Sequence, residues 1–264
     1  MDAARYLRRV GVDPGRVTTS LESLHRLQRA HVEAVPFENL SIVGDPFTTG
    51  HGEGVTLDPD ALYEKVVGRE RGGYCFELNG LFHGLLRELG FDADRVAACV
   101  LEADGSVGTP ANHHTNVVHL DRRYVVDVGL AVPPLRRPLP LDGSVRTDRA
   151  GVNWRVVDSD RPDADYLTRF RKPGGEWTDR YVLQKRPREL SYFGASCDYL
   201  STAPESPFTG DPVVTVGTGE GYKKLDRETL TVYREGAETE RDVPRGEWHD
   251  TLAAEFGLRV GQTA

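Results

Sequence analysis

The spacing of apolar residues divides the chain into a helical first third and a strand-rich remainder. Before residue 91, apolar side chains recur every three or four positions, as in helices with one buried face. The clearest such run follows Cys75, ends at Gly90, and comprises Leu78, Leu81, Phe82, Leu85, Leu86 and Leu89. Two earlier helices are predicted to begin after residues 18–20 and at Asp58, where hydroxyl and carboxylate oxygens can cap free backbone N–H groups.

From Phe91 the hydrophobic period changes to two, the period of a β-strand with one buried face. The predicted strands are residues 96–101, 113–120, 124–128, 154–157, 180–184, 213–217 and 228–233. Residues 247–256 return to helical spacing. The Pro-rich residues 132–141 are predicted to be irregular or at a sheet edge, because proline has no N–H to donate. The residue pattern alone therefore predicts only that helices come first and strands later.

Cys75 is a candidate nucleophile because of the residues around it. Gly72 and Gly73 permit a tight turn before it, and a predicted helix begins with it. The free N–H groups and positive dipole end of a helix start favour the charged form of a thiol. For an isolated residue, the commoner alternative is a small buried cysteine with a structural role.

An imidazole and a carboxylate follow on a predicted hairpin. Two strands flank a turn at residues 121–123, which brings one of the adjacent histidines, His113 or His114, opposite Asp127. A cysteine with distant histidine and aspartate partners is the arrangement of a nucleophile, its base and the group that orients the base. Together, these features favour catalysis over a structural role.

The sequence resembles the arylamine N-acetyltransferase family over essentially its whole length. The family's nucleophile motif, R-G-G-x-C-[FW]-E-x-N, is matched by residues 71–79. Its block H-x-x-L-x-V-x-[LI]-D…V-D-[VA]-G is matched loosely by residues 113–129. Further matches lie at both ends of the chain, at Tyr6, Leu7, Arg9, Gly11, Leu24, Leu27, Ala30, His31 and residues 36–40, 206–208 and 256–258.

The resemblance implies a Cys-His-Asp triad that takes an acyl group from a thioester, usually acetyl-CoA. The acyl group then passes from a cysteinyl thioester to an arylamine or hydrazine by a ping-pong mechanism without a metal. The implied fold is α+β with a papain/transglutaminase-like catalytic core. Its three domains are an N-terminal helical bundle with the nucleophile (residues 1–90), a central β-barrel with the histidine and aspartate (91–200), and a C-terminal α/β lid (201–264).

The family spacing selects His113 as the base. Eight residues separate the family's histidine from its turn aspartate, and His113 and Asp121 reproduce that spacing. The predicted catalytic residues are therefore Cys75, His113 and Asp127. Neighbouring strand residues face opposite sides of a sheet. If His114 were the base, the opposite side of this strand would therefore face the catalytic site.

Phe37, Tyr74 and Gly129 are the predicted substrate contacts, with the two aromatic rings along an arylamine pocket. The chain departs from the family directly after Gly129, where a loop of small residues is usual. Residues 130–134 instead include two prolines, which offer no N–H to a phosphate. Two alternatives therefore stay open, an amide synthase that uses a carrier-protein thioester and a Cys-His-Asp hydrolase of thioesters or amides. The complete triad argues against a third, a degenerate binding module.

Composition agrees with a cytoplasmic enzyme. The chain has 264 residues, and its net charge of −8 with a pI of about 5.5 argues against general nucleic-acid affinity. No stretch approaches the roughly 18 apolar residues of a membrane helix, and no signal peptide is recognisable. Three widely spaced cysteines form neither a disulfide framework nor a zinc motif. We expect a monomer or weak homo-oligomer without nucleic-acid or membrane partners.

Several polar residues are predicted to be structural. Arg9, Glu38 and Arg71 lie in otherwise apolar segments, and buried charges must be paired, so a buried Arg–Glu–Arg cluster is expected. Glu77 and Asn79, on the first turn of the Cys75 helix, are positioned to cap it or to brace nearby loops. Cys99 and Cys197 are expected in β-rich stretches, where they are inert.

Overall fold

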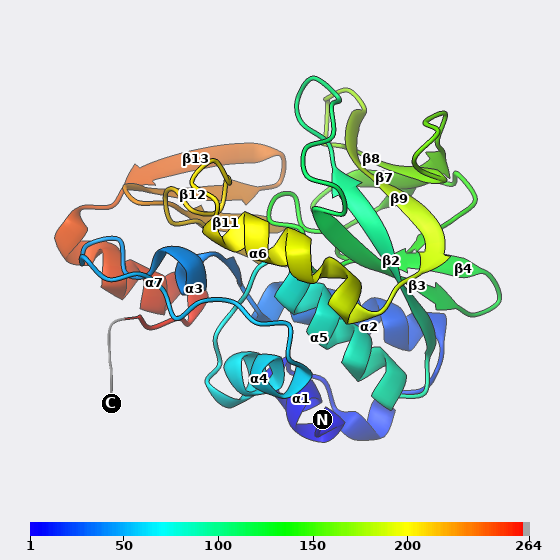
Figure 1. Ribbon diagram of the computed structural model, residues 1–264, viewed down its shortest axis with the longest axis horizontal. Helices are drawn as coiled ribbons and strands as arrows, with labels where there is room; N and C mark the ends of the chain where they lie inside the picture. Colours follow the sequence, from blue (N-terminus) through cyan, green and yellow to red (C-terminus); the bar gives the residue numbers. More distant parts are fainter. Residues whose placement is uncertain (261–264) are drawn as a thin grey trace.

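The computed structural model describes residues 1–260 and contains two β-sheets packed against a set of helices (Figure 1). Predicted caps are present in the N-terminal segment, where Ser20 accepts a hydrogen bond from Ser23 N and Asp58 accepts from Ala61 N. The helices of this segment are α1 (Ala3–Arg9), η1 (Pro14–Arg16), α2 (Leu21–Ala34), α3 (Leu40–Val43), α4 (Pro59–Tyr63), η2 (Glu64–Gly68) and α5 (Cys75–Glu88). No helix among these residues, or in the rest of the described chain, is long and apolar enough to cross a membrane.

The larger sheet has eight strands in the order β5-β4-β3-β2-β9-β8-β7-β6. Because β5 also lies against β7, the sheet is nearly closed into a barrel. Helix α5 packs against β2 and β3. The strands are β2 (Asp92–Val100), β3 (His113–His119), β4 (Arg123–Val126), β5 (Leu139–Pro140), β6 (Arg146–Thr147), β7 (Asn153–Asp158), β8 (Tyr166–Arg171) and β9 (Thr178–Pro187).

The smaller sheet has five strands in the order β1-β10-β11-β12-β13. Its edge strand β1 (Phe37–Glu38) comes from the N-terminal segment and pairs with β10. The remaining elements are η3 (Leu190–Phe193), α6 (Gly194–Thr202), β10 (Val214–Gly217), β11 (Gly221–Leu225), β12 (Thr229–Arg234), β13 (Ala237–Asp242), η4 (Arg245–Glu247) and α7 (Trp248–Phe256). The division into three domains stays a prediction.

The predicted fold class, mixed helix and sheet with a barrel-like sheet, is confirmed. All the predicted strands coincide with observed ones, but the sequence pattern missed the short elements β1, α3 and β6 as well as β8, β11, β13 and α6. Strand β13 is exposed at every position, so it has no alternation to detect. The placement of Cys197 in a β-rich stretch was wrong, since this residue lies in α6.

The predicted Arg9–Glu38–Arg71 cluster was wrong in one member. Arg71 Nη2 lies 3.1 Å from Glu38 Oε1, and the other carboxylate oxygen accepts from the backbone N–H of Leu40 at 2.6 Å. The Arg9 guanidinium instead donates to the backbone carbonyls of Ala34 and Glu70. Glu38 therefore holds the turn into α3 as well as Arg71, and needs no second arginine.

A second buried ion pair, which the sequence did not indicate, joins η2 to the start of α5. Lys65 Nζ lies 2.7 Å and 2.9 Å from the two Glu77 carboxylate oxygens, and the side chains are only 5% and 2% exposed. We expect Lys65→Met to lower the free energy of unfolding by about 3–5 kcal/mol, because it leaves the Glu77 charge buried and unpaired. Urea unfolding monitored by fluorescence measures this change.

Arg234→Met is the matched control for Lys65→Met. Arg234 pairs with Glu220 at 2.9 Å, but these side chains are 69% and 51% exposed. Solvent screening limits the value of such a pair to about 1 kcal/mol or less. Equal losses in the two variants would contradict the importance assigned to burial of the Lys65–Glu77 pair.

Candidate active site

Cys75 is held at the first residue of α5 by the turn before it. A Cβ atom on Gly72 would lie 2.3 Å from the backbone oxygen of Pro36, so only glycine fits there. The next glycine forms a β-bridge with Phe37. The N–H of Tyr74 donates to Glu77 Oε2 at 3.1 Å, as in a capping box. These contacts fix the turn that leads into α5, and with it the position of Cys75.

His113 and Asp127 form a buried pair at the start of β3 and just past the end of β4. His113 Nε2 lies 2.7 Å from Asp127 Oδ2, and the two side chains are 1% and 0% exposed. His114 points to the other face of the strand, where its Nε2 lies 3.2 Å from the backbone oxygen of Phe76. The structure thus brings His113, rather than His114, against the carboxylate.

Asn79 braces the aspartate from the second turn of α5. Its amide nitrogen donates to Asp127 Oδ1 at 2.9 Å and to the backbone oxygen of His114 at 2.7 Å. Its amide oxygen accepts from Val128 N at 2.9 Å. The bracing role predicted for Asn79 is therefore confirmed, and it links the helix to the ends of both strands.

Gly129 allows the segment after Asp127 to approach the backbone of Cys75. A Cβ atom there would lie 2.9 Å from Cys75 Cα and 2.7 Å from the amide nitrogen of Asn79. The N–H of Gly129 also donates to Asp127 Oδ1 at 2.9 Å. Any larger residue at this position would separate the cysteine from the hairpin.

The surroundings of Asp127 stabilise its charged form. Burial opposes ionisation, but the contact with His113 and the bonds from Asn79 and Gly129 outweigh it and hold the pKa of Asp127 below its ordinary value. A charged carboxylate can only accept, so Nε2 of His113 carries the hydrogen that it donates. This leaves Nδ1 as the ring nitrogen that can take up a proton.

The surroundings of Cys75 favour the neutral thiol. Burial raises the pKa of Cys75 well above its ordinary value, and Cys197 and Asp127 act in the same direction. The backbone N–H of Phe76 at the helix start opposes this rise without cancelling it. The helix start thus acts in the expected direction, through the N–H of Phe76, but burial outweighs it. Ionisation requires a partner that takes the proton.

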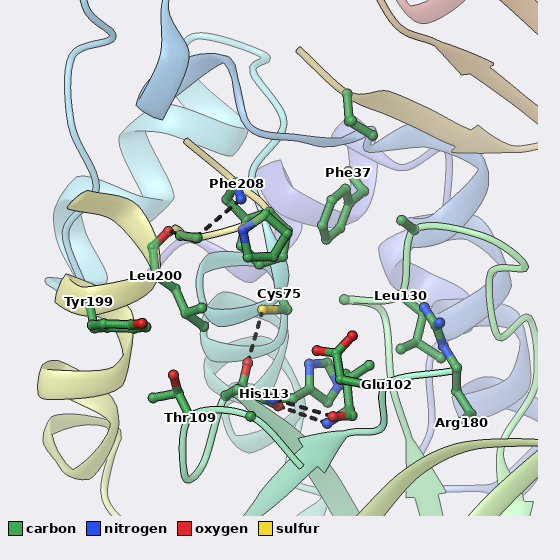
Figure 2. Close-up of a pocket in the computed structure, with 18 of the residues that line it drawn as sticks. Phe37, Cys75, Glu102, Thr109, His113, Leu130, Arg180, Tyr199, Leu200 and Phe208 are labelled. Carbon is green, nitrogen blue, oxygen red and sulfur yellow. Dashed lines mark hydrogen bonds between the residues drawn. The ribbon is translucent and has the colours of Figure 1, made fainter. Parts of the chain in front are cut away.

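Cys75 and His113 line the same cavity, which has a volume of about 600 Å³ (Figure 2). Apolar side chains such as Phe37, Leu130 and Phe208 share its walls with polar and charged ones. Figure 2 shows Tyr199 and Leu200 on one side of the cavity and Leu130 and Arg180 on the other. The remaining lining residues include Phe37, Val100, Glu102, Thr109, Asn112, Gly129, Ala131, Glu205, Ser206, Pro207, Phe208 and Val213.

Two of the three residues predicted to contact substrate lie at this cavity. Phe37 and Gly129 line it. Tyr74 does not: its side chain is fully buried, and its hydroxyl lies 2.8 Å from Cys197 Sγ and 3.2 Å from the backbone oxygen of that residue. Tyr74 precedes the helix and points away from the cavity toward α6, so its placement in the acceptor pocket was wrong.

The hydrophobic pattern did not place residues 199–208 or Arg180 in the wall of a cavity. Residues 199–202 belong to α6, a helix that this pattern missed, and residues 203–208 follow it. Arg180 reaches the cavity because β9 pairs with β2. The one available indication that Arg180 lies at a cavity was its position within a predicted strand, since a charge there needs a partner or solvent.

Comparison with known proteins places this arrangement among one group of enzymes. A family model for N-acetyltransferases matches residues 20–264. An arylamine N-acetyltransferase of Mycolicibacterium smegmatis is 34% identical, over 100% of this chain and 94% of its own length. Proansamycin X synthase of Amycolatopsis mediterranei is 32% identical, over 72% of this chain and 70% of its own length. The crystal structure of an arylamine N-acetyltransferase from Bacillus cereus, which has a Cys-His-Glu catalytic triad, is 25% identical, with a TM-score of 0.86 over 98% of this chain and 100% of that one.

Proposed function

Since this chain belongs to the arylamine N-acetyltransferase family, a family of acyltransferases, we propose that it transfers an acetyl group from acetyl-CoA to arylamines or hydrazines through Cys75. The supporting observation is the 2.7 Å contact between His113 and Asp127 at the cavity that His113 and Cys75 both line. In this proposal Cys75 is the nucleophile, His113 is its base, and Asp127 orients the base.

In the first half-reaction, His113 Nδ1 takes the proton from the Cys75 thiol. The sulfur lone pair then forms a bond with the carbonyl carbon of acetyl-CoA, and the carbonyl π electrons move to the oxygen. When the tetrahedral intermediate collapses, the carbon–sulfur bond to CoA breaks, and the leaving sulfur receives the proton from His113. The charged Asp127 stabilises the imidazolium that exists between these steps.

The negative oxygen of the intermediate needs donors that are already in place. Backbone N–H groups in the first turn of α5 have no partners within the helix, and the one on Phe76 lies beside Cys75. We assign this helix start as the oxyanion site, where preorganised donors have their largest effect.

In the second half-reaction, an amine attacks the acetyl-cysteine. Its nitrogen forms a bond with the carbonyl carbon and loses a proton to His113, and the Cys75 sulfur leaves with the electrons of the carbon–sulfur bond. The apolar walls, including Phe37 and Phe208, suit an aromatic acceptor. The CoA thiol leaves before the amine reacts, so the kinetics are ping-pong.

The loop after Gly129 is expected to weaken recognition of the CoA nucleotide more than that of the acyl thioester. Leu130 and Ala131 line the cavity, and the backbone oxygen of Ala131 already accepts from Thr215 at 3.2 Å. Pro133 and Pro134 have no N–H for a phosphate. We therefore propose slow but real turnover with acetyl-CoA.

The match to the mycobacterial acetyltransferase covers the whole chain, whereas the match to Proansamycin X synthase covers 72% of it. This difference in coverage favours acetyl transfer over the amide synthase alternative.

We further propose that the enzyme acts in the cytoplasm. Its three cysteines are free, and a thiol nucleophile persists in a reducing compartment.

Thiol release from acetyl-CoA, followed with and without an arylamine, tests the proposed function. We expect continuous release only when the amine is present, with one acetylated amine formed for each thiol. Specificity constants for acetyl-CoA, acetyl-pantetheine and p-nitrophenyl acetate with one arylamine should differ little. Continuous release without an amine would identify a hydrolase, and a strong preference for acetyl-CoA would show that the altered loop does not limit nucleotide recognition.

A further inference from the structure

Four arginines and a histidine gather where helix α2 meets the loops around strands β5 and β6. The chain carries a net charge of −8, so its average composition gives no reason for cations to cluster. Four of these five side chains are half-buried, and only Arg149 is exposed. We call them the basic cluster, and its members are His25, Arg29, Arg137, Arg146 and Arg149.

Helix α2 and the loop before β5 are joined by a buried hydrogen bond. Gln28 Nε2 donates to the backbone oxygen of Leu135 at 2.8 Å, and both residues are buried. His25 and Arg29 lie four positions apart on α2, so they share one face of the helix. The bond holds this part of α2 beside Arg137, two residues after Leu135.

A second hydrogen bond brings in β6 and the turn that follows it. Arg137 Nη1 donates to the backbone oxygen of Thr147 at 2.6 Å. Arg146 lies one residue before that acceptor, and Arg149 lies two residues after it. Three separate segments therefore contribute cations to one place on the molecule.

The charges in the basic cluster are close enough to act on one another. Burial lowers the pKa of His25, and the charges of Arg137, Arg29 and Arg149 lower it further. Burial also lowers the pKa of Arg137, and Arg146 acts in the same direction. The neighbours thus make each charged form less favourable, an effect that a bound anion would reverse.

No carboxylate within residues 1–260 forms an ion pair with the basic cluster. Asp148 acts on the charge of Arg137, but both oxygens of this carboxylate are occupied. One accepts from Arg136 at 2.9 Å, and the other accepts from the backbone N–H groups of Ala150 and Val152. Like charges repel one another at this range, so an anion from outside the described chain would stabilise the cluster.

We propose that the basic cluster binds a small molecule that carries several phosphate groups. The planar fork of a guanidinium donates two parallel hydrogen bonds to phosphate oxygens, and the permanent charges of the cluster are all arginines. One phosphate would leave most of them unpaired, whereas a chain of phosphates reaches several. None of the five residues lines the cavity of Cys75, so this site is separate from the acetyl-transfer site and does not depend on the proposed function.

The burial of the basic cluster favours a small ligand over a macromolecule. A half-buried guanidinium is reached more readily by a small anion than by the flat surface of a membrane, which usually contacts exposed lysines and arginines. The cluster also contains no aromatic ring other than the imidazole of His25, whereas single-stranded nucleic acids are usually bound by stacking of their bases on aromatic side chains.

Isothermal titration calorimetry with sodium tripolyphosphate tests the inference, at one ionic strength maintained with NaCl so that nonspecific attraction is screened equally. We expect the wild type to bind it, and Arg29→Gln and Arg149→Gln each to raise the Kd by about 10- to 100-fold, as for loss of hydrogen bonds to a charged group. Both side chains reach solvent, so neither replacement leaves a cavity in a core. Arg227→Gln, the same change at an exposed arginine between β11 and β12, should leave the Kd as in the wild type.

Three other results would overturn the inference. Absence of tripolyphosphate binding to the wild type, or an equal rise in Kd in all three variants, would show at most a general attraction of anions. Sedimentation of the wild type with phosphatidylserine vesicles, lost in Arg29→Gln and Arg149→Gln and found without tripolyphosphate binding, would assign the basic cluster to a membrane surface. A fall in kcat/KM for acetyl-CoA but not for acetyl-pantetheine in Arg149→Gln would assign the cluster to the acyl donor.

Discussion

Cys75→Ala is expected to lose acetyl transfer entirely, with kcat reduced by at least about 10⁴-fold. In the proposed mechanism the Cys75 sulfur carries the acetyl group, and among residues 1–260 no other cysteine lines this cavity. Product formation from acetyl-CoA and an arylamine, followed by chromatography, measures the loss. The fold should remain, because alanine suits the start of a helix and fills most of the volume of the buried thiol.

Cys99→Ala is the control for this result. Cys99 is a free cysteine on β2, and its side chain lies at a different cavity from Cys75. We expect this variant to retain normal turnover. Retained activity in Cys75→Ala, or loss of activity in Cys99→Ala, would show that Cys75 is not the nucleophile.

His113→Ala is expected to abolish acylation and to shift the alkylation of Cys75 to higher pH. Burial raises the pKa of the Cys75 thiol. In the proposed mechanism, transfer of the thiol proton to His113 offsets that effect. Without the imidazole, the thiolate should form only above the ordinary thiol pKa of about 8.5. The rate of iodoacetamide reaction with Cys75 between pH 5 and pH 10 measures the shift directly.

His114→Asn is the matched comparison for His113→Ala. His114 lies one residue along the strand, on the face toward Phe76 and Phe193. Its replacement should leave the alkylation profile where it is in the wild type, even where it lowers stability. A larger shift in His114→Asn than in His113→Ala would show that the base lies on the opposite face of β3.

Much of the site follows from local sequence pattern. The helix that starts at Cys75, the strand that begins at His113 and the strand that ends just before Asp127 all follow from the periodicity of near neighbours in the sequence. Local pattern also indicates that Asn79 faces the hairpin, because it lies four residues after Cys75 on the same side of the helix.

Other features of the site depend on contacts between segments that are far apart in the sequence. The spacing of apolar residues, every 2 in a strand or every 3.6 in a helix, carries no information about such contacts. Arg180 reaches the cavity only because β9 pairs with β2, about 80 residues earlier in the chain. Arg9 was assigned to Glu38 on charge alone, whereas its guanidinium donates to backbone carbonyls. Lys65, to which the sequence pattern assigned no partner, pairs with another buried carboxylate, that of Glu77. Tyr74 was expected to line an arylamine pocket as an aromatic ring, but its hydroxyl lies against Cys197 of α6, a contact between distant segments.

The pKa of Cys75 also depends on contacts that the sequence pattern does not encode. A helix start lowers the pKa of a thiol when the thiol is near solvent, and the sequence identifies the helix start. The extent of burial is set by the packing of Phe37, Gly129 and α6 around the cysteine, and its effect is the larger one.

Mass spectrometry of the protein after brief exposure to acetyl-CoA without an amine tests whether Cys75 receives the acetyl group with help from His113. We expect one added acetyl group, located on the peptide that contains Cys75, which disappears when an arylamine is added and does not form in His113→Ala. An acetyl group on Cys99 or Cys197, or amine acetylation without any acetylated enzyme, would contradict it.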